Sequence, residues 1–86
     1  MTKERDTELR HAILEELANT PQGYMQTEKA LRASLRLSVC PPPEEAEVHV
    51  AMRRLEADAM THCEVDALGV KRWCITGIGR AALYEK

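Results

Sequence analysis

The 86 residues suffice for one domain, and a composition of 44% hydrophobic and 30% charged residues is that of a globular protein. No apolar run approaches the roughly 18 residues that cross a bilayer, and the first residues lack the apolar segment of a signal peptide, so a membrane protein is not expected. Three cysteines at irregular spacing argue against a secreted disulfide framework, which favours reduced thiols and a cytoplasmic location.

The net charge of −2 is unevenly distributed along the chain. Residues 44–66 carry two basic and seven acidic side chains, a net charge of −5, whereas residues 67–86 carry four basic and one acidic, a net charge of +3. Neutralisation of phosphates supplies most of the affinity of nucleic-acid-binding proteins. The overall charge therefore disfavours strong DNA binding by an isolated monomer.

An apolar stripe near the amino terminus predicts a first helix over about residues 7–19. Leu9, Ile13 and Leu17 recur every four residues and form one face of it. The sequence leaves open whether the preceding segment is ordered, and residues 1–6 could be disordered.

A shorter second helix is predicted after residues 24–25, which can add a short strand. Thr27 is the expected N-cap, because a threonine hydroxyl accepts from the free amides of the first turn. Leu31 and Leu35 form the apolar stripe, and the helix should end near Arg36.

The third predicted helix has the best apolar periodicity in the chain. Residues 37–42 form a connector before it, in which Cys40-Pro41-Pro42 should be extended. Pro43 is expected in the first turn of the helix, where a missing N–H costs nothing. Its stripe is made of Val48, Met52, Leu55 and Ala59, with Ala51 beside it.

Two strands and a glycine turn follow, and the alternation of side chains separates a core face from a solvent face. The core face is expected to hold Thr61, Cys63, Val65, Trp73 and Ile75. The opposite face is expected to hold His62, Glu64, Asp66, Arg72, Cys74 and Thr76. Gly69 supplies the turn, and Thr76 caps a last helix over residues 77–84 that packs back through Leu83.

These elements predict an α+β, mainly helical fold: a winged helix-turn-helix with three helices, a two-stranded wing hairpin and a short C-terminal helix. Residues 1–86 form one such domain. The predicted core consists of Leu9, Ile13, Leu17, Leu31, Leu35, Val48, Met52, Leu55, Cys63, Val65, Trp73, Ile75 and Leu83.

The end of the third helix and the end of the hairpin resemble winged-helix proteins of the MarR and PadR type. The helix ends in Arg-Arg-Leu-Glu-Ala-Asp-Ala-Met (residues 53–60), and Ile-Thr-Gly-Ile-Gly-Arg (residues 75–80) is similar to the Leu-Thr-x-x-Gly-Arg turn of those families. A fainter likeness, through Gly23-Tyr24 and Leu55-Glu56, is to small winged-helix proteins of Mu-like prophages. The resemblance implies a DNA-binding protein that is related to transcription regulators.

Basic residues on the second helix, the third helix and the wing are the candidates for contacts with DNA. They are Lys29, Arg32, Arg36, His49, Arg53, Lys71 and Arg72. Such contacts to phosphates position a protein without specifying a sequence, and the alternative is a solvated surface. A lone module makes few contacts, so useful affinity implies a homodimer or a larger complex.

The third helix begins with Glu44, Glu45 and Glu47, which repel phosphates. We therefore expect any DNA to be held by the wing and the second helix, with weak sequence specificity. The three carboxylates have two interpretations. They stabilise the positive end of the helix dipole, or they form an acidic surface that binds a basic protein partner. The second interpretation gives an alternative function, a protein–protein interaction module that binds no DNA.

Metal binding and catalysis have no support in the sequence. The histidines and cysteines considered, His49, His62, Cys40, Cys63 and Cys74, lack the close pairs of structural zinc sites. Strand parity places Cys63 and Cys74 on opposite faces, which argues against a disulfide between them. There is no glycine-rich phosphate loop and no nucleophile–base spacing, so neither an enzyme nor a cofactor is expected.

Overall fold

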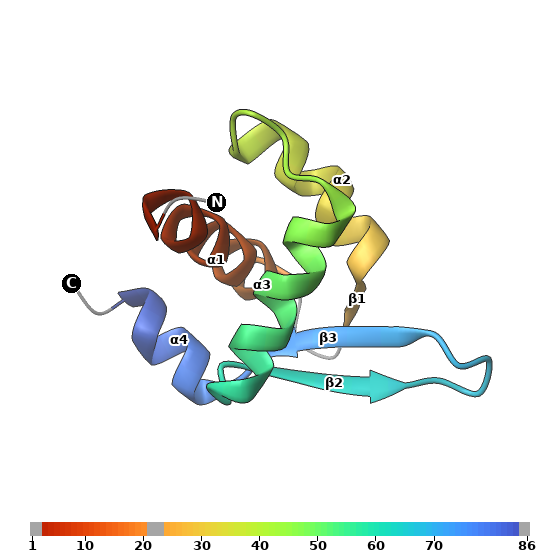
Figure 1. Cartoon of the computed structure of the whole chain (residues 1–86). Coiled ribbons are helices and arrows are strands. Elements are labelled where there is room, and N and C mark those ends of the chain that lie inside the picture. Colours follow the sequence, from red (N-terminus) through yellow and green to blue (C-terminus); the bar gives the residue numbers. More distant parts are fainter. Residues whose placement is uncertain (1–2, 21–23, 85–86) are drawn as a thin grey trace.

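The computed structural model describes residues 3–20 and 24–84, and these form four helices and a three-stranded antiparallel sheet (Figure 1). The elements are α1 (Lys3–Ala18), β1 (Gln26–Thr27), α2 (Glu28–Ser38), α3 (Glu45–Ala57), β2 (Thr61–Val65), β3 (Lys71–Ile75) and α4 (Gly77–Tyr84). The order and the mainly helical α+β class confirm the predicted winged helix-turn-helix. No helix in the described part of the chain is long and apolar enough to cross a membrane.

Helix α1 begins at Lys3, so the expected start at residue 7 is wrong, and residues 3–6 are helical rather than disordered. A long-range contact explains the difference. Asp6 is only 7% exposed, and its Oδ2 accepts a hydrogen bond from Nη1 of Arg54 on α3 at 3.1 Å. This partner is 48 residues away in the chain, and periodicity cannot reveal it. Residues 1–2 lie outside the described residues.

Thr27 is the N-cap of α2, as predicted, and its Oγ1 accepts a hydrogen bond from the backbone N–H of Ala30 at 3.2 Å. The helix continues to Ser38, two residues beyond the expected end. Val39 follows it and is 2% exposed, so the connector also contributes to the core.

Helix α3 begins at Glu45, two residues after Pro43, so the prediction that Pro43 lies in its first turn is wrong. Glu44 is the N-cap, and Pro43 precedes it as a buried residue. The backbone N–H of Glu44 donates to Oε1 of Glu47 at 3.2 Å, which closes a capping box. The sequence offered this signal, since an acceptor three residues after the N-cap is typical of a helix start.

The carboxyl end of α3 also differs from the prediction, because Ala59 is exposed and lies beyond the helix. Its φ is 60°, in the left-handed region. The N–H of Ala59 donates to the carbonyl of Glu56 at 3.0 Å, and the N–H of Met60 donates to that of Leu55 at 2.9 Å. These two bonds make a Schellman motif, which is usually completed by glycine.

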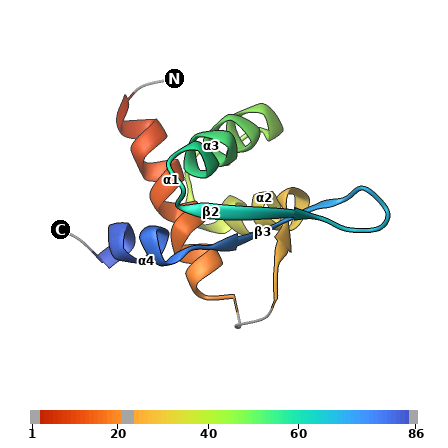
Figure 2. The same ribbon diagram turned by 90° about the horizontal axis from the view of Figure 1, so that it is seen from below.

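The strands lie in the order β1-β3-β2, with Cys63 opposite Trp73 and Thr61 opposite Ile75. The predicted parity of the hairpin is therefore confirmed. Val65, however, is 62% exposed and does not belong to the core. It pairs with Lys71 at the far end of the hairpin, which projects beyond the helices (Figures 1 and 2).

The buried core is made by residues of α1, α2 and α3, together with Val39 and with Trp73 of β3. Its members are Leu9, Ile13, Leu14, Leu17, Leu31, Leu35, Val39, Val48, Ala51, Met52, Leu55 and Trp73. Three residues that were predicted in the core are half-buried and pack against it: Cys63, Ile75 and Leu83. Leu14 was missed because it lies off the four-residue stripe of the first helix. Val39 was missed because it lies beyond the expected end of the second helix.

Candidate nucleic-acid interface

A groove of about 640 Å³ runs between α2, the start of α3 and the wing. Four of the predicted DNA-contacting residues line it: Lys29, Arg32, Arg36 and Lys71. Their carboxylate neighbours in the groove are Glu28 and Glu45, so its lining carries an excess of two positive charges. The fold thus brings α2 and the wing together on one basic surface, whereas His49, Arg53 and Arg72 lie outside the groove lining.

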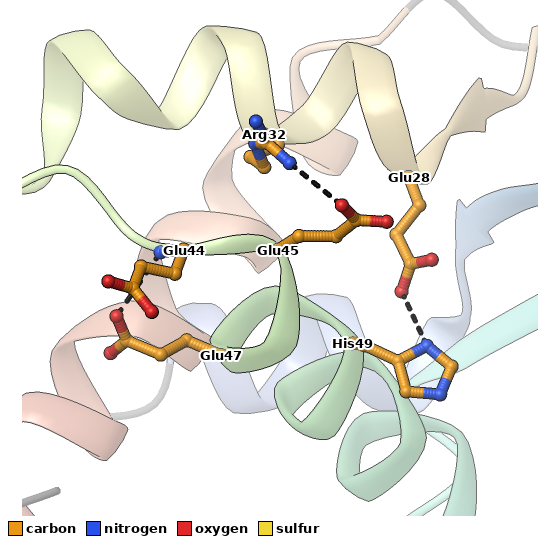
Figure 3. Close-up of polar contacts among 6 residues, drawn as sticks. All are labelled: Glu28, Arg32, Glu44, Glu45, Glu47 and His49. Carbon is orange, nitrogen blue, oxygen red and sulfur yellow. Dashed lines mark hydrogen bonds and ion pairs between the residues drawn. The ribbon is translucent and has the colours of Figure 1, made fainter.

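Three of the predicted residues, Arg32, His49 and Arg72, are held by carboxylates of the same molecule, and Arg72 lies 3.2 Å from Asp66 in the wing. Arg32 Nη1 lies 3.3 Å from Glu45 Oε2, and His49 Nδ1 lies 3.2 Å from Glu28 Oε1, so both pairs join α2 to α3 (Figure 3). These contacts connect α2 and α3 at the surface. They also mean that a phosphate would have to compete with a carboxylate for either side chain.

The other four predicted residues have no ion pair within residues 3–20 and 24–84. They are Lys29, Arg36, Arg53 and Lys71, and all are exposed. An exposed cation without an acidic partner is free to neutralise a phosphate with no internal contact to break. Three of the four line the groove.

The wing turn is organised by Asp66, a residue whose role the sequence analysis missed. Its Oδ1 accepts from the backbone N–H groups of Leu68 and Val70 at 2.9 and 3.0 Å, and its Oδ2 accepts from Arg72 Nε at 3.2 Å. The hydrogen bond from the Val70 amide, followed by those from Leu68 and Arg72, lowers the pKa of Asp66. An aspartate three residues before the turn glycine was the available signal. Arg72 therefore braces the turn that presents Lys71.

The three glutamates at the start of α3 are engaged in different ways, and Glu44 and Glu47 form the capping box. Glu45 faces Arg32 on α2 (Figure 3). Glu47 Oε1 accepts from the backbone of Glu44, and its Oε2 lies 3.3 Å from Arg5 Nε on α1. The bond from the Glu44 backbone, and then that from Arg5, lowers the pKa of Glu47. These contacts support the interpretation that the carboxylates stabilise the helix start.

The cysteine and histidine residues that were considered as metal ligands are dispersed. The described residues contain no group of three His, Cys, Asp or Glu side chains placed to share an ion. Cys63 and Cys74 sit on opposite faces of the hairpin, and both are half-buried. Burial raises the pKa of the Cys63 thiol.

The sequence matches no protein-family model and no curated protein, but the fold matches solved structures. A proposed transcriptional regulator from Thermoplasma acidophilum superposes with a TM-score of 0.79 at 15% identity, over 95% of this chain and 79% of the other. A PadR-family transcription regulator from Clostridium difficile R20291 superposes with a TM-score of 0.69, also at 15% identity, over 87% and 78%. The fainter likeness to prophage proteins stays a prediction, and Gly23 lies outside the described residues. The chain is therefore a winged helix-turn-helix with the fold of PadR-type transcription regulators.

Proposed function

We propose that this protein binds double-stranded DNA in the manner of a small transcription regulator, with phosphate contacts from α2 and the wing. The observation that carries the proposal is the basic groove between these two elements. It collects Lys29, Arg36 and Lys71, which come from distant parts of the sequence and have no ion pair within the described residues. The likeness of the fold to regulators supports the same class of function.

The net charge of −2 does not oppose this proposal, because the charges are segregated by the fold. The groove carries four basic and two acidic side chains, while carboxylates such as Asp6 and Glu47 are paired with arginines at the α1–α3 contact. Phosphates interact with the local field of the surface they touch, which is screened beyond about 10 Å at moderate ionic strength. A homodimer would double the contacts and bring the affinity into a useful range.

The test is the salt dependence of binding to a fluorescently labelled duplex of random sequence. Each neutralised phosphate contributes about −0.9 to the slope of log K against log salt concentration. Replacing both Lys29 and Lys71 by alanine should therefore reduce the slope by about two units and weaken binding equally on all sequences. Arg80→Ala, which removes one exposed charge from α4, is the control and should leave the slope unchanged.

Absence of binding to any duplex at low ionic strength would refute the proposal. The alternative function, a protein-interaction module with an acidic α3 surface, would then replace it. An Arg80 variant that lost as much slope as the double lysine variant would show a diffuse charge effect instead of a groove.

A further inference from the structure

The free end of the wing hairpin carries apolar side chains that the core does not use. Val65 is 62% exposed, Leu68 in the turn is 89% exposed and Val70 is 40% exposed. Turns are usually built from small or polar residues, and this end of the hairpin projects beyond the described helices (Figures 1 and 2). Packing within the described part of the molecule therefore does not account for these three side chains. A cluster of exposed apolar residues, unlike a single one, is typical of a contact surface.

The turn that presents Leu68 is held in place by Asp66. The N–H groups of Leu68 and Val70 donate to Asp66 Oδ1 at 2.9 and 3.0 Å, and the N–H of Gly69 donates to the Asp66 carbonyl at 3.0 Å. Arg72 Nε donates to Oδ2 at 3.2 Å and balances the charge of the carboxylate. Because the backbone of the turn is already ordered, a contact made by the Leu68 side chain costs little further conformational entropy. Leu68 is thus a pre-formed apolar projection at the end of the wing.

Charge indicates which partner this projection fits. The turn adjoins the basic groove, since Gly69, Val70 and Lys71 all line it. Lys71 has no ion pair within residues 3–20 and 24–84, and the carboxylate of the turn, Asp66, is occupied by Arg72. A partner that meets the cations and the apolar tip together must present negative charge around an apolar interior. Duplex DNA has this chemistry, because its phosphates lie outside and its bases are stacked inside.

We propose that the protein bends DNA, with Leu68 inserted as a wedge between two stacked base pairs. This inference rests on the proposed DNA binding and adds a bending activity to it. Apolar wedges that unstack a base step from the minor groove kink the duplex by about 20–90°. Burial of the leucine side chain between the bases offsets the cost of unstacking them. Pyrimidine–purine steps such as TA open most easily, so a step of this kind is expected at the wing tip.

The experiment measures bending and unstacking in a short duplex that contains a single central TA step. Donor and acceptor dyes at the two ends report the bend as a rise in energy transfer. In a second duplex, 2-aminopurine replaces the adenine of the TA step, and its fluorescence rises when the step is unstacked. At saturating concentrations of the full chain, both signals should rise, and the energy transfer should correspond to a bend of about 20° or more. A duplex with a mismatch at the step should bind more tightly, because part of the unstacking cost is already met.

The variants separate the wedge from the phosphate contacts. Leu68→Ala should lose the bend, the 2-aminopurine signal and the preference for the mismatch, while the salt dependence of binding stays that of the parent. Leu68→Met keeps an apolar side chain of similar volume, so it should retain most of the bend. Leu37→Ala is the matched control, since Leu37 is a 93% exposed leucine at the far end of α2 and outside the groove lining, and it should bend DNA as the parent does. Circular dichroism checks that each variant is folded.

The two proposals fail in different ways. If the parent protein binds DNA and leaves it straight, or if Leu68→Ala bends DNA as the parent does, only the wedge is overturned. If the NMR signal of the Leu68 amide does not shift when DNA binds, the tip is free for a contact with another protein, and the wedge is again overturned while DNA binding stands. If the parent protein binds no duplex at low ionic strength, both proposals are overturned.

Discussion

Among the three glycines that the structure describes, Gly79 in the first turn of α4 is predicted to be the most sensitive to substitution by a residue with a Cβ. A Cβ at this position would lie 2.2 Å from the carbonyl oxygen of Met60 and 2.9 Å from Cγ1 of Ile75, whereas ordinary contacts begin at 3.4 Å. The nearest atom belongs to backbone, so α4 must move by about 1 Å to admit it. That movement strains two hydrogen bonds of Thr76, from its N–H to the Met60 carbonyl at 3.1 Å and from its Oγ1 to the Ala59 carbonyl at 2.6 Å.

The expected loss for Gly79→Ala can be worked from these contacts. Overpacking costs about 1–3 kcal/mol, and each strained hydrogen bond costs about 1 kcal/mol. The better helix propensity of alanine returns about 1 kcal/mol. We expect the free energy of unfolding to fall by about 3 kcal/mol, within a range of about 2–4 kcal/mol. A loss of about 3 kcal/mol lowers the Tm of a domain of this size by roughly 12–24 °C.

Gly77→Ala is the matched control, because it lies two residues earlier in the same helix and a Cβ there meets no atom within 4 Å. It should leave the free energy of unfolding unchanged or raise it by up to about 1 kcal/mol. Urea denaturation followed by circular dichroism measures both variants. A Gly79→Ala protein within about 0.5 kcal/mol of the parent would refute the close approach of α4 to the Met60 carbonyl.

Three further predictions concern the helix end, the thiols and the wing turn. Ala59→Gly should raise the free energy of unfolding by up to about 1 kcal/mol in urea denaturation, because the exposed Ala59 has a φ of 60°; a loss of stability would contradict this. In single-cysteine variants at neutral pH, Cys63 should react with a disulfide reagent more slowly than the exposed Cys40, since burial raises the pKa of Cys63, and equal rates would count against it. The pKa of Asp66 is lower in the folded protein than in the unfolded chain, so its contribution to the stability of the turn is complete above the unfolded pKa and is lost as the pH falls through the folded pKa. The NMR shift of the Val70 amide, which donates to Asp66, should therefore change with a midpoint below pH 3.8. A midpoint above pH 3.8 would be inconsistent with this contact.

The sequence by itself determined the features that depend on local backbone geometry. Thr27 caps α2, the stripe from Val48 to Leu55 faces the core, and Cys63 shares a face with Trp73. Gly69 adopts the left-handed conformation, with a φ of 82°, that its turn requires. Each follows from a period of 3.6 or 2 residues, or from the needs of a cap or turn, and these operate over a few residues.

The tertiary structure decided which of these residues are covered and which charges are paired. Parity placed Val65 on the core side, but none of the described helices covers that end of the hairpin, and Val65 is exposed. Composition suggested an acidic α3, but Arg5 and Arg32 draw Glu47 and Glu45 to its flanks. Burial and pairing depend on what another part of the chain places opposite a side chain. Asp6 and Arg54, 48 residues apart, meet only after the helices have packed, so no local pattern records their contact.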